Sequence, residues 1–115
     1  MTATDLITMH EDHGAAMTEI GGQPVVRDYG RPARTHRAVR NGVGVIEQPY
    51  GVIVVEGSDR VSYVDNIVSN QVPEPDEGGC YAVICSPQGL IEVDLYIYSG
   101  AERVLILTPP GRAQR

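Results

Sequence analysis

The sequence predicts an α+β domain built mainly from antiparallel strands, with helices covering one face of the sheet. Short β-branched runs follow one another closely and are joined by glycine and proline turns, a pattern that favours hairpins over long crossovers. Two segments of helical character lie among them, so the predicted order is ββαββαβββ. At 115 residues the chain is long enough for one core but not for two, and we expect residues 1–115 to form a single domain.

The first half of the chain is expected to contain a hairpin and a helix. Gly21 and Gly22 separate two short runs, which is a hairpin signal. Pro32 suits the first turn of a helix, and Gly42 suits its end. The predicted elements are a polar lead-in or frayed helix over 1–12, strands over 15–20 and 23–26, and a helix over 32–40.

The second half is expected to contain most of the strands. A helix beginning after Ser58 or Asp59 is the clearest prediction in the chain, because apolar residues recur there at helical spacing. Its buried stripe is predicted to consist of Val61, Val64, Ile67 and Val68. Residues 72–79 are rich in proline, acids and glycine and predict a loop. The predicted strands are 43–46, 52–56, 80–86, 90–98 and 103–108.

Composition excludes some classes of function. The formal net charge of −6 repels phosphate backbones and anionic membrane surfaces, so neither nucleic acid nor membrane is an expected partner. All nine basic residues are arginine, and phenylalanine and tryptophan are absent, so tyrosine and aliphatic residues must build the core. Base composition or salt adaptation accounts for this bias more readily than function does.

The cysteine pattern predicts a reduced protein. Cys80 and Cys85 stand five positions apart in one predicted strand, so their side chains are expected on opposite faces and cannot pair there. The sequence shows no Cys-x-x-Cys motif, no charged and then apolar leader, and no apolar run long enough to cross a bilayer. We therefore expect a cytoplasmic location.

The strand over 90–98 alternates between an apolar and a polar face. Glu92, Asp94, Tyr96 and Tyr98 share the polar face, while aliphatic residues occupy the positions between them. Two carboxylates and two phenols on one side could orient a polar ligand. A solvated outer face would show the same pattern, so both interpretations stay open.

Two clusters of charged residues leave similar alternatives. Arginines recur every three residues along one side of the predicted helix 32–40, and could bind an anion or form a solvated face that pairs with acidic neighbours. His10 and His13, with two acids between them, imitate a metal site but lack a placed third ligand. No metal is expected. The arginines that recur along the predicted helix 32–40, called the arginine stripe below, are Arg31, Arg34, Arg37 and Arg40.

Several short landmarks occur in an order that points to a known family. They include the early sequence HGA, then GQPV, HRAVR and GVIE, and after the predicted helix the sequence SNQV. The next landmarks are a glycine before Tyr81, then Gly89, and then the pair Asp94 and Leu95. Taken together, this ordered set resembles the N-terminal part of the aminomethyltransferase of the glycine cleavage system, the T protein, and its tetrahydrofolate-binding relatives.

The resemblance implies a fold, a cofactor and candidate site residues. It implies part of the folate-binding domain of the T-protein fold, with tetrahydrofolate as cofactor and transfer of a one-carbon unit as the reaction. The one-carbon donor would be small, and a lipoyl carrier protein is a possible partner. Matched position by position, the implied folate-binding residues are Tyr50, Gln71, Tyr81, Val83 and Asp94.

The chain departs from the family at Gln71. The family has an aspartate there, beside the folate nitrogen that receives the one-carbon unit, where a carboxylate can accept a proton or stabilise positive charge. Gln71 can hydrogen-bond but cannot act as that base. This favours two alternatives to aminomethyl transfer: a folate-dependent demethylase of a small methylated substrate, or a non-catalytic folate-binding module that assists iron–sulfur cluster assembly.

The family also continues well beyond residue 115. The resemblance therefore implies a truncated folate-binding domain that is inactive alone and has an open sheet edge. Either a homo-oligomer or a missing C-terminal half would complete it.

Overall fold

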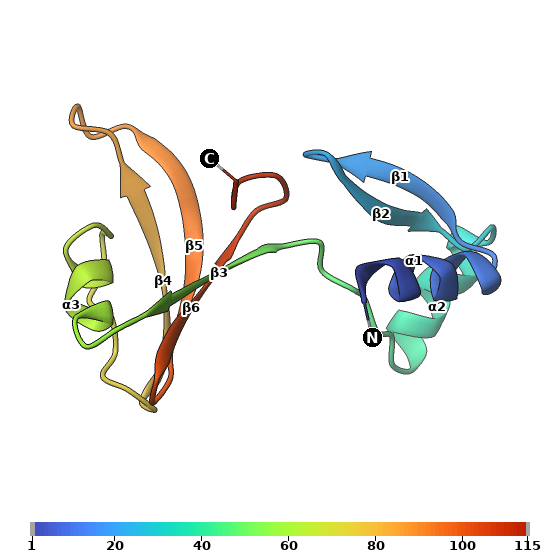
Figure 1. Cartoon of the computed structure of the whole chain (residues 1–115). Coiled ribbons are helices and arrows are strands. Elements are labelled where there is room, and N and C mark those ends of the chain that lie inside the picture. Colours follow the sequence, from blue (N-terminus) through green and yellow to red (C-terminus); the bar gives the residue numbers. More distant parts are fainter. Residues whose placement is uncertain (1, 115) are drawn as a thin grey trace. The chain divides into compact units, whose positions relative to one another are not determined.

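The computed structural model describes residues 2–114 and divides the chain into two compact units, Met1–Pro49 and Tyr50–Arg115 (Figure 1). That residues 1–115 form a single domain stays a prediction. None of the helices within 2–114 is long and apolar enough to cross a membrane. The elements of the first unit are α1 (Ala3–Asp12), β1 (Ala16–Ile20), β2 (Gln23–Asp28) and α2 (Pro32–Asn41). Those of the second are β3 (Gly51–Glu56), α3 (Arg60–Asp65), β4 (Gly78–Cys85), β5 (Ile91–Ser99) and β6 (Arg103–Thr108).

The N-terminal segment contains a capped helix, α1. Of the two predicted alternatives, a polar lead-in or a frayed helix, the structure shows a helix, and its start is capped. The hydroxyl oxygen of Thr2 accepts the backbone N–H of Asp5 at 3.2 Å, and Asp5 Oδ2 accepts the N–H of Thr2 at 2.6 Å. This reciprocal pair satisfies two N–H groups that a helix start otherwise leaves open. It also lowers the pKa of Asp5, because the carboxylate accepts hydrogen bonds from the backbone and the side chain of Thr2.

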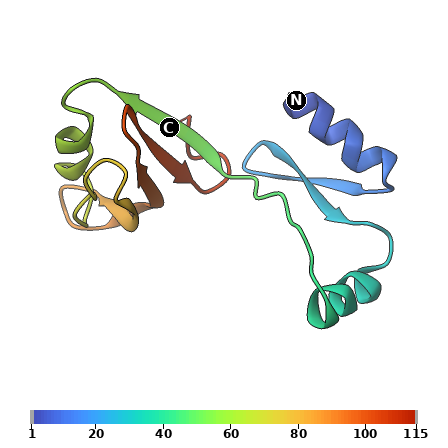
Figure 2. The same cartoon turned by 90° about the horizontal axis from the view of Figure 1, so that it is seen from below.

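The hairpin and the second helix form where the sequence predicts them. Strands β1 and β2 pair antiparallel around Gly21 and Gly22, both of which have positive φ (Figure 2). Helix α2 begins at Pro32 and buries none of its residues within the described structure.

The predicted strand over 43–46 is wrong. These residues have no regular structure, and Val43, Val45 and Ile46 are 87%, 97% and 74% exposed. β-branched residues favour a strand only where a partner strand can satisfy the backbone and bury one face. No such partner lies beside them in the described residues, so propensity alone does not make a strand here.

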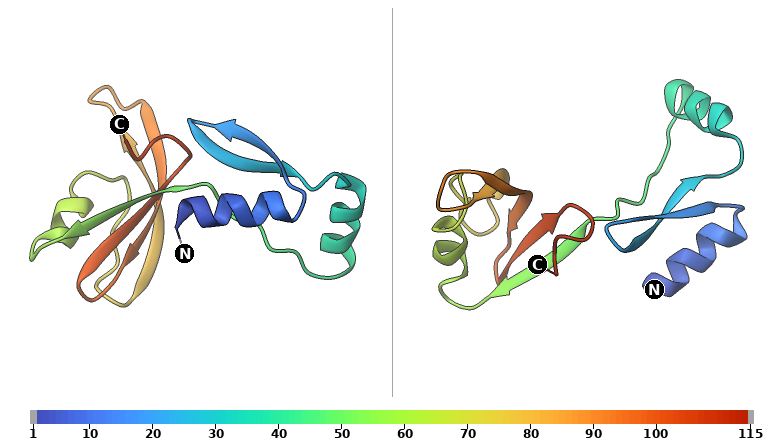
Figure 3. Two further views of the ribbon diagram at one scale, coloured as in Figure 1. Left: turned by 45° about the vertical axis from the view of Figure 1, so that its right-hand side comes forward. Right: turned by 90° about the horizontal axis from the view of Figure 1, so that it is seen from above.

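The second unit is built on a four-stranded antiparallel sheet in the order β3-β6-β5-β4. Helix α3 packs on one face of this sheet, as Figures 1 and 3 show. The core between them contains three side chains with no exposed surface, Val64 of α3, Ile97 of β5 and Val104 of β6. The α+β class with antiparallel strands is therefore confirmed.

Helix α3 is shorter than predicted. It ends at Asp65, and Ile67 and Val68 lie in the turns that follow. Val64 is fully buried and Val61 and Val68 pack against the core, whereas Ile67 is 43% exposed. The backbone turn, rather than a continuous helix, places the last part of the apolar stripe. A carboxylate oxygen of Asp65 accepts the N–H of Val72 at 2.8 Å and holds the chain beyond the turn.

Strand β5 shows the predicted alternation. Leu95 and Ile97 are 2% and 0% exposed on the face that α3 covers, whereas Tyr96 and Tyr98 are 41% and 47% exposed on the opposite face. In the described residues of this unit, no helix covers that opposite face. Cys80 and Cys85 are both free, and a register shift separates Ile84 from Cys85.

The two faces of the sheet predict different responses to the same substitution. We expect Val104→Ala on the covered face to lower the free energy of unfolding by about 2 kcal/mol, because it leaves a cavity in the core. Val54→Ala on β3 removes the same atoms from a side chain that is 48% exposed, and we expect a loss below about 1 kcal/mol. Urea denaturation monitored by circular dichroism measures both. Equal losses would contradict the assignment of the two faces.

Candidate functional site

Three tyrosines form a cluster on the uncovered face of the sheet. Tyr81 of β4 and Tyr96 of β5 are direct cross-strand partners, and their ring centroids lie 5.2 Å apart. Tyr50, which immediately precedes β3, packs edge-on to Tyr96 with a centroid distance of 6.3 Å. Tilted and edge-to-face pairs at these distances are favourable aromatic contacts. The cluster presents a firm aromatic surface that is about half exposed at Tyr81.

Asp94 fixes the position of the Tyr81 hydroxyl. The two residues lie on adjacent strands of this face, and the hydroxyl group donates to Asp94 Oδ2 at 3.1 Å. This hydrogen bond is the main cause that raises the pKa of Tyr81, and the negative charge of Asp94 adds to it. Val83 is the direct cross-strand partner of Asp94 and is half-buried beside it.

The segment before Gln71 is fastened to the edge of β4. Ser69 exchanges two hydrogen bonds with Val83: its N–H donates to the carbonyl of Val83 at 2.9 Å, and its hydroxyl oxygen accepts the N–H of Val83 at 3.0 Å. The side chain of Asn70 donates to the carbonyl of Tyr81 at 3.0 Å and accepts the N–H of Gln71 at 2.9 Å. The backbone of Gln71 is therefore held next to the middle of β4, where Tyr81 and Val83 lie, and its side chain is exposed.

The structure brings most of the site residues named from the sequence close together. Tyr50, Tyr81 and Asp94 contact one another directly or through Tyr96, and Val83 is paired with Asp94. Gln71 reaches the same part of the hairpin through its backbone. Tyr96 is the residue that residue-by-residue matching missed, although the alternation over 90–98 had placed it on the polar face. A surface of tilted aromatic rings edged by a carboxylate suits a planar ring system that carries hydrogen-bonding groups.

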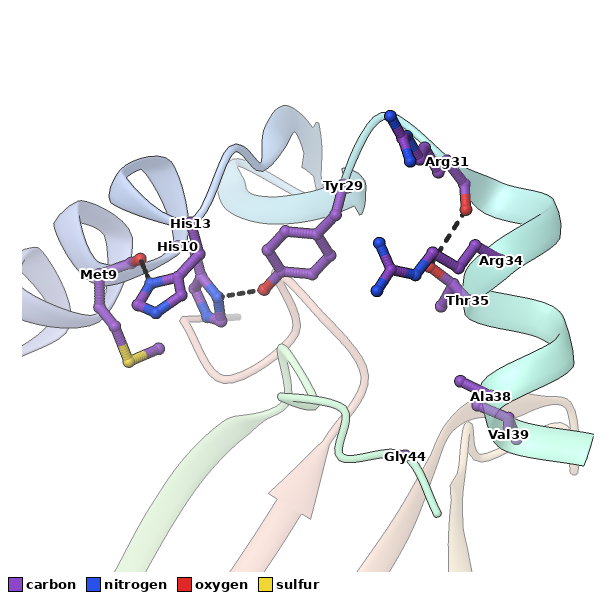
Figure 4. Close-up of a pocket in the computed structure, with 10 residues that line it drawn as sticks. All are labelled: Met9, His10, His13, Tyr29, Arg31, Arg34, Thr35, Ala38, Val39 and Gly44. Carbon is purple, nitrogen blue, oxygen red and sulfur yellow. Dashed lines mark hydrogen bonds between the residues drawn. The ribbon is translucent and has the colours of Figure 1, made fainter. Parts of the chain in front are cut away.

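A second, separate arrangement lies in the first unit around His10, which is 8% exposed. Its Nε2 lies 2.5 Å from Glu47 Oε2. Its Nδ1 lies 2.7 Å from the hydroxyl of Tyr29, a contact that Figure 4 shows. His13 bonds only its own helix, with Nδ1 2.7 Å from the carbonyl of Met9. The two histidines therefore have different surroundings, and residues 2–114 contain no group of three or more potential metal ligands. Sequence reasoning missed this network because Glu47 lies 37 positions from His10.

The Tyr81 hydrogen bond predicts a pH response. The neutral phenol is the form that donates to Asp94, so its contribution to stability is present below the ordinary pKa of 10.0 and is lost as the pH rises above that value. We expect Asp94→Asn to lower the pKa of Tyr81 toward the ordinary value. The measurement is an ultraviolet titration, with the Tyr81→Phe trace subtracted to isolate this phenol. Glu56→Gln, which removes one charge from a distant strand, is the control and should leave the pKa unchanged.

The His10 network predicts a difference between the two nearby histidines. His10→Ala leaves the hydroxyl of Tyr29 and the carboxylate of Glu47 without their shared partner, so we expect a loss of about 2 kcal/mol in the free energy of unfolding. His13→Ala removes only an exposed bond within one helix, and we expect less than about 0.5 kcal/mol. Thermal and urea unfolding of both variants measure the difference. A loss at His13 as large as that at His10 would rule out a special role for the buried ring.

Comparison with known proteins places this chain in a family. Residues 6–115 match the model of the GCVT N-terminal domain. An aminomethyltransferase of Halothermothrix orenii is 31% identical over 118 aligned residues, covering 100% of this chain and 33% of that protein. A probable aminomethyltransferase of Halobacterium salinarum is 33% identical over 91 residues, covering 77% of this chain and 25% of that protein.

A solved structure agrees with the fold. The crystal structure of glycine cleavage system aminomethyltransferase T from Bartonella henselae matches with a TM-score of 0.73 at 19% identity, covering 95% of this chain and 31% of that chain. The chain spans a quarter to a third of the length of the relatives it matches. Because the family model covers almost every residue, this chain belongs to the GCVT N-terminal domain family.

Proposed function

We propose that this chain forms part of a tetrahydrofolate site in a protein that transfers one-carbon units, of the aminomethyltransferase type. The observation that carries the proposal is the cluster of Tyr50, Tyr81 and Tyr96 with Asp94 on the uncovered sheet face of a member of this family. Family members generally bind tetrahydrofolate, and Tyr50, Tyr81 and Asp94 are among the residues that the resemblance to the family matches.

The chemistry of the cluster fits the pterin ring of a folate. A pterin is flat and aromatic and carries hydrogen-bonding groups on its edge. The half-exposed rings of Tyr81 and Tyr96 offer a surface for stacking or edge contacts. Asp94 keeps the Tyr81 hydroxyl in place, so the ring is oriented before a ligand arrives.

In this proposal the chain supplies binding and orientation. Tetrahydrofolate, when bound, supplies the nitrogen that receives the one-carbon unit. The tyrosines position the ring system, and the backbone anchors at Ser69 and Asn70 hold Gln71 near the hairpin. A cytoplasmic location, a small one-carbon donor and a lipoyl carrier protein as partner belong to the same proposal. The rest of the site would come from residues outside this chain.

Gln71 favours a second candidate function. A neutral amide at this position cannot accept a proton, so aminomethyl transfer would lack its base while folate binding could persist. The alternatives are a folate-dependent demethylase or a folate-binding protein without catalysis that assists iron–sulfur cluster assembly. The exposure of Gln71 is compatible with direct contact to a ligand in each case.

Folate binding should depend on the tyrosine face. We expect Tyr81→Ala to weaken tetrahydrofolate binding about tenfold or more, because it removes an aromatic contact and releases Asp94. Tyr63→Ala is the matched control, since Tyr63 is 59% exposed on α3 and lies outside the cluster. Fluorescence or calorimetric titration under anaerobic conditions gives both affinities. The titrations use the longest protein that the gene encodes, and if that protein binds no folate, the proposal fails.

A carboxylate at position 71 should restore the missing chemistry. We expect Gln71→Asp to raise glycine-dependent aminomethyl transfer about a hundredfold in the longest protein that the gene encodes. Gln71→Asn provides the matched control, because it has the size of aspartate but stays neutral. The rate of formation of methylenetetrahydrofolate is the measurement. An unchanged rate in the aspartate variant would favour another methyl donor or a non-catalytic role.

A further inference from the structure

The first unit contains an open cavity of about 580 Å³ between α1 and α2 (Figure 4). Tyr29, Arg31 and Arg34 line it at the start of α2, and His13 lines it at the end of α1. In Figure 4 the guanidinium group of Arg34 extends from the helix toward Tyr29. Two strong hydrogen-bond donors with fixed positive charge therefore face one space.

These two arginines have no acidic partner in the described structure. Residues 29–46 contain four arginines and no aspartate or glutamate. The acids that flank this segment are already engaged: Asp28 accepts from Arg27 at 2.9 Å, and Glu47 binds the buried histidine. Among residues 2–114, the ion pairs within 4.0 Å include neither Arg31 nor Arg34. The interpretation of the stripe as a face that pairs with acidic neighbours therefore does not hold at these two positions.

The place of the arginines in the helix makes a bound anion more favourable. Arg31 is the N-cap residue of α2 and provides no side-chain cap, and the first turn contains no acidic residue. The N-terminus of a helix carries partial positive charge, so two arginines here repel the helix dipole. An anion placed between them would remove this repulsion and would meet two forked donors that match a carboxylate or a phosphate.

The remaining lining includes the polar side chains of His10 and Thr35, but several of its residues are apolar, and part of it is rigid. Met9 comes from α1, and Ala38 and Val39 come from the second half of α2. Tyr29 is fixed, because its hydroxyl lies 2.7 Å from Nδ1 of His10, which in turn is held by Glu47. The cavity thus combines positive charge at the start of α2 with apolar side chains from both helices, which suits a small organic anion better than a bare inorganic ion.

We propose that this cavity binds a small organic anion, with its carboxylate or phosphate between Arg31 and Arg34 and its apolar body against Met9 and Val39. This site lies in the first compact unit, whereas the tyrosine cluster lies in the second, so it does not depend on the proposed folate function. It adds a second binding site to the one proposed for the tyrosine cluster.

The test uses benzoate and phenyl phosphate as probes, with benzamide as the neutral analogue, titrated into the 115-residue chain and followed by calorimetry or by NMR. We expect saturable binding of at least one of the two anions. Arg34→Gln and Arg31→Gln should each weaken it about tenfold, since each removes a charge-assisted hydrogen bond. Arg40→Gln, which removes the same charge from the last turn of the same helix, should change the affinity less than twofold.

The results of these titrations distinguish a carboxylate ligand from a phosphate ligand and show when the proposal fails. Tighter binding of benzoate identifies a carboxylate ligand, and tighter binding of phenyl phosphate identifies a phosphate ligand. The proposal is overturned if benzamide binds as well as benzoate, because charge would then play no part. It is also overturned if Arg40→Gln weakens binding as much as Arg34→Gln, or if neither anion binds in a saturable way.

Discussion

The pairing of β5 with both β4 and β6 is the constraint on which the second unit depends. Because side chains alternate along this strand, its register decides at once which residues build the core and which form the candidate site. Leu95 and Ile97 face α3, and Asp94 and Tyr96 face the opposite way. A slip of one residue would bury the carboxylate and expose the core, so stability and binding surface are set by the same backbone hydrogen bonds.

In the first unit, a single side chain has a comparable role. His10 connects helix α1 to Tyr29 at the end of the hairpin and to Glu47 in the irregular segment beyond α2. The burial of its imidazole is compatible with stability because both ring nitrogens have partners. The end of the hairpin and the irregular segment beyond α2 are thereby tied to one helix, even though this unit has no buried aliphatic cluster among its described residues.

Much of the second unit could be predicted from the sequence, because the information there is local. The alternation over 90–98 and the turn at Gly89 specify a two-faced hairpin without reference to other segments. Val43, Val45 and Ile46 show the limit of such reasoning, since strand propensity says nothing about whether a partner strand is present. The clustering of Tyr50 with Tyr96 and the contact of His10 with Glu47 are long-range results of folding. Motif matching could name Tyr50, but no local pattern could have paired His10 with its distant carboxylate.

The hydrogen bonds that Ser69 and Asn70 make to β4 bear on how this protein avoids self-association. An unpaired strand edge is a template for adding strands from other chains, which leads to aggregation. Around Val83 the N–H and carbonyl groups that would recruit such a strand are already occupied by Ser69. The opposite edge, β3, pairs with no further strand among the described residues of the second unit and carries the exposed Val52 and Val54. Growth of the sheet by a further strand is therefore blocked in the middle of β4, so a strand added to this unit would meet free backbone groups at β3 rather than there.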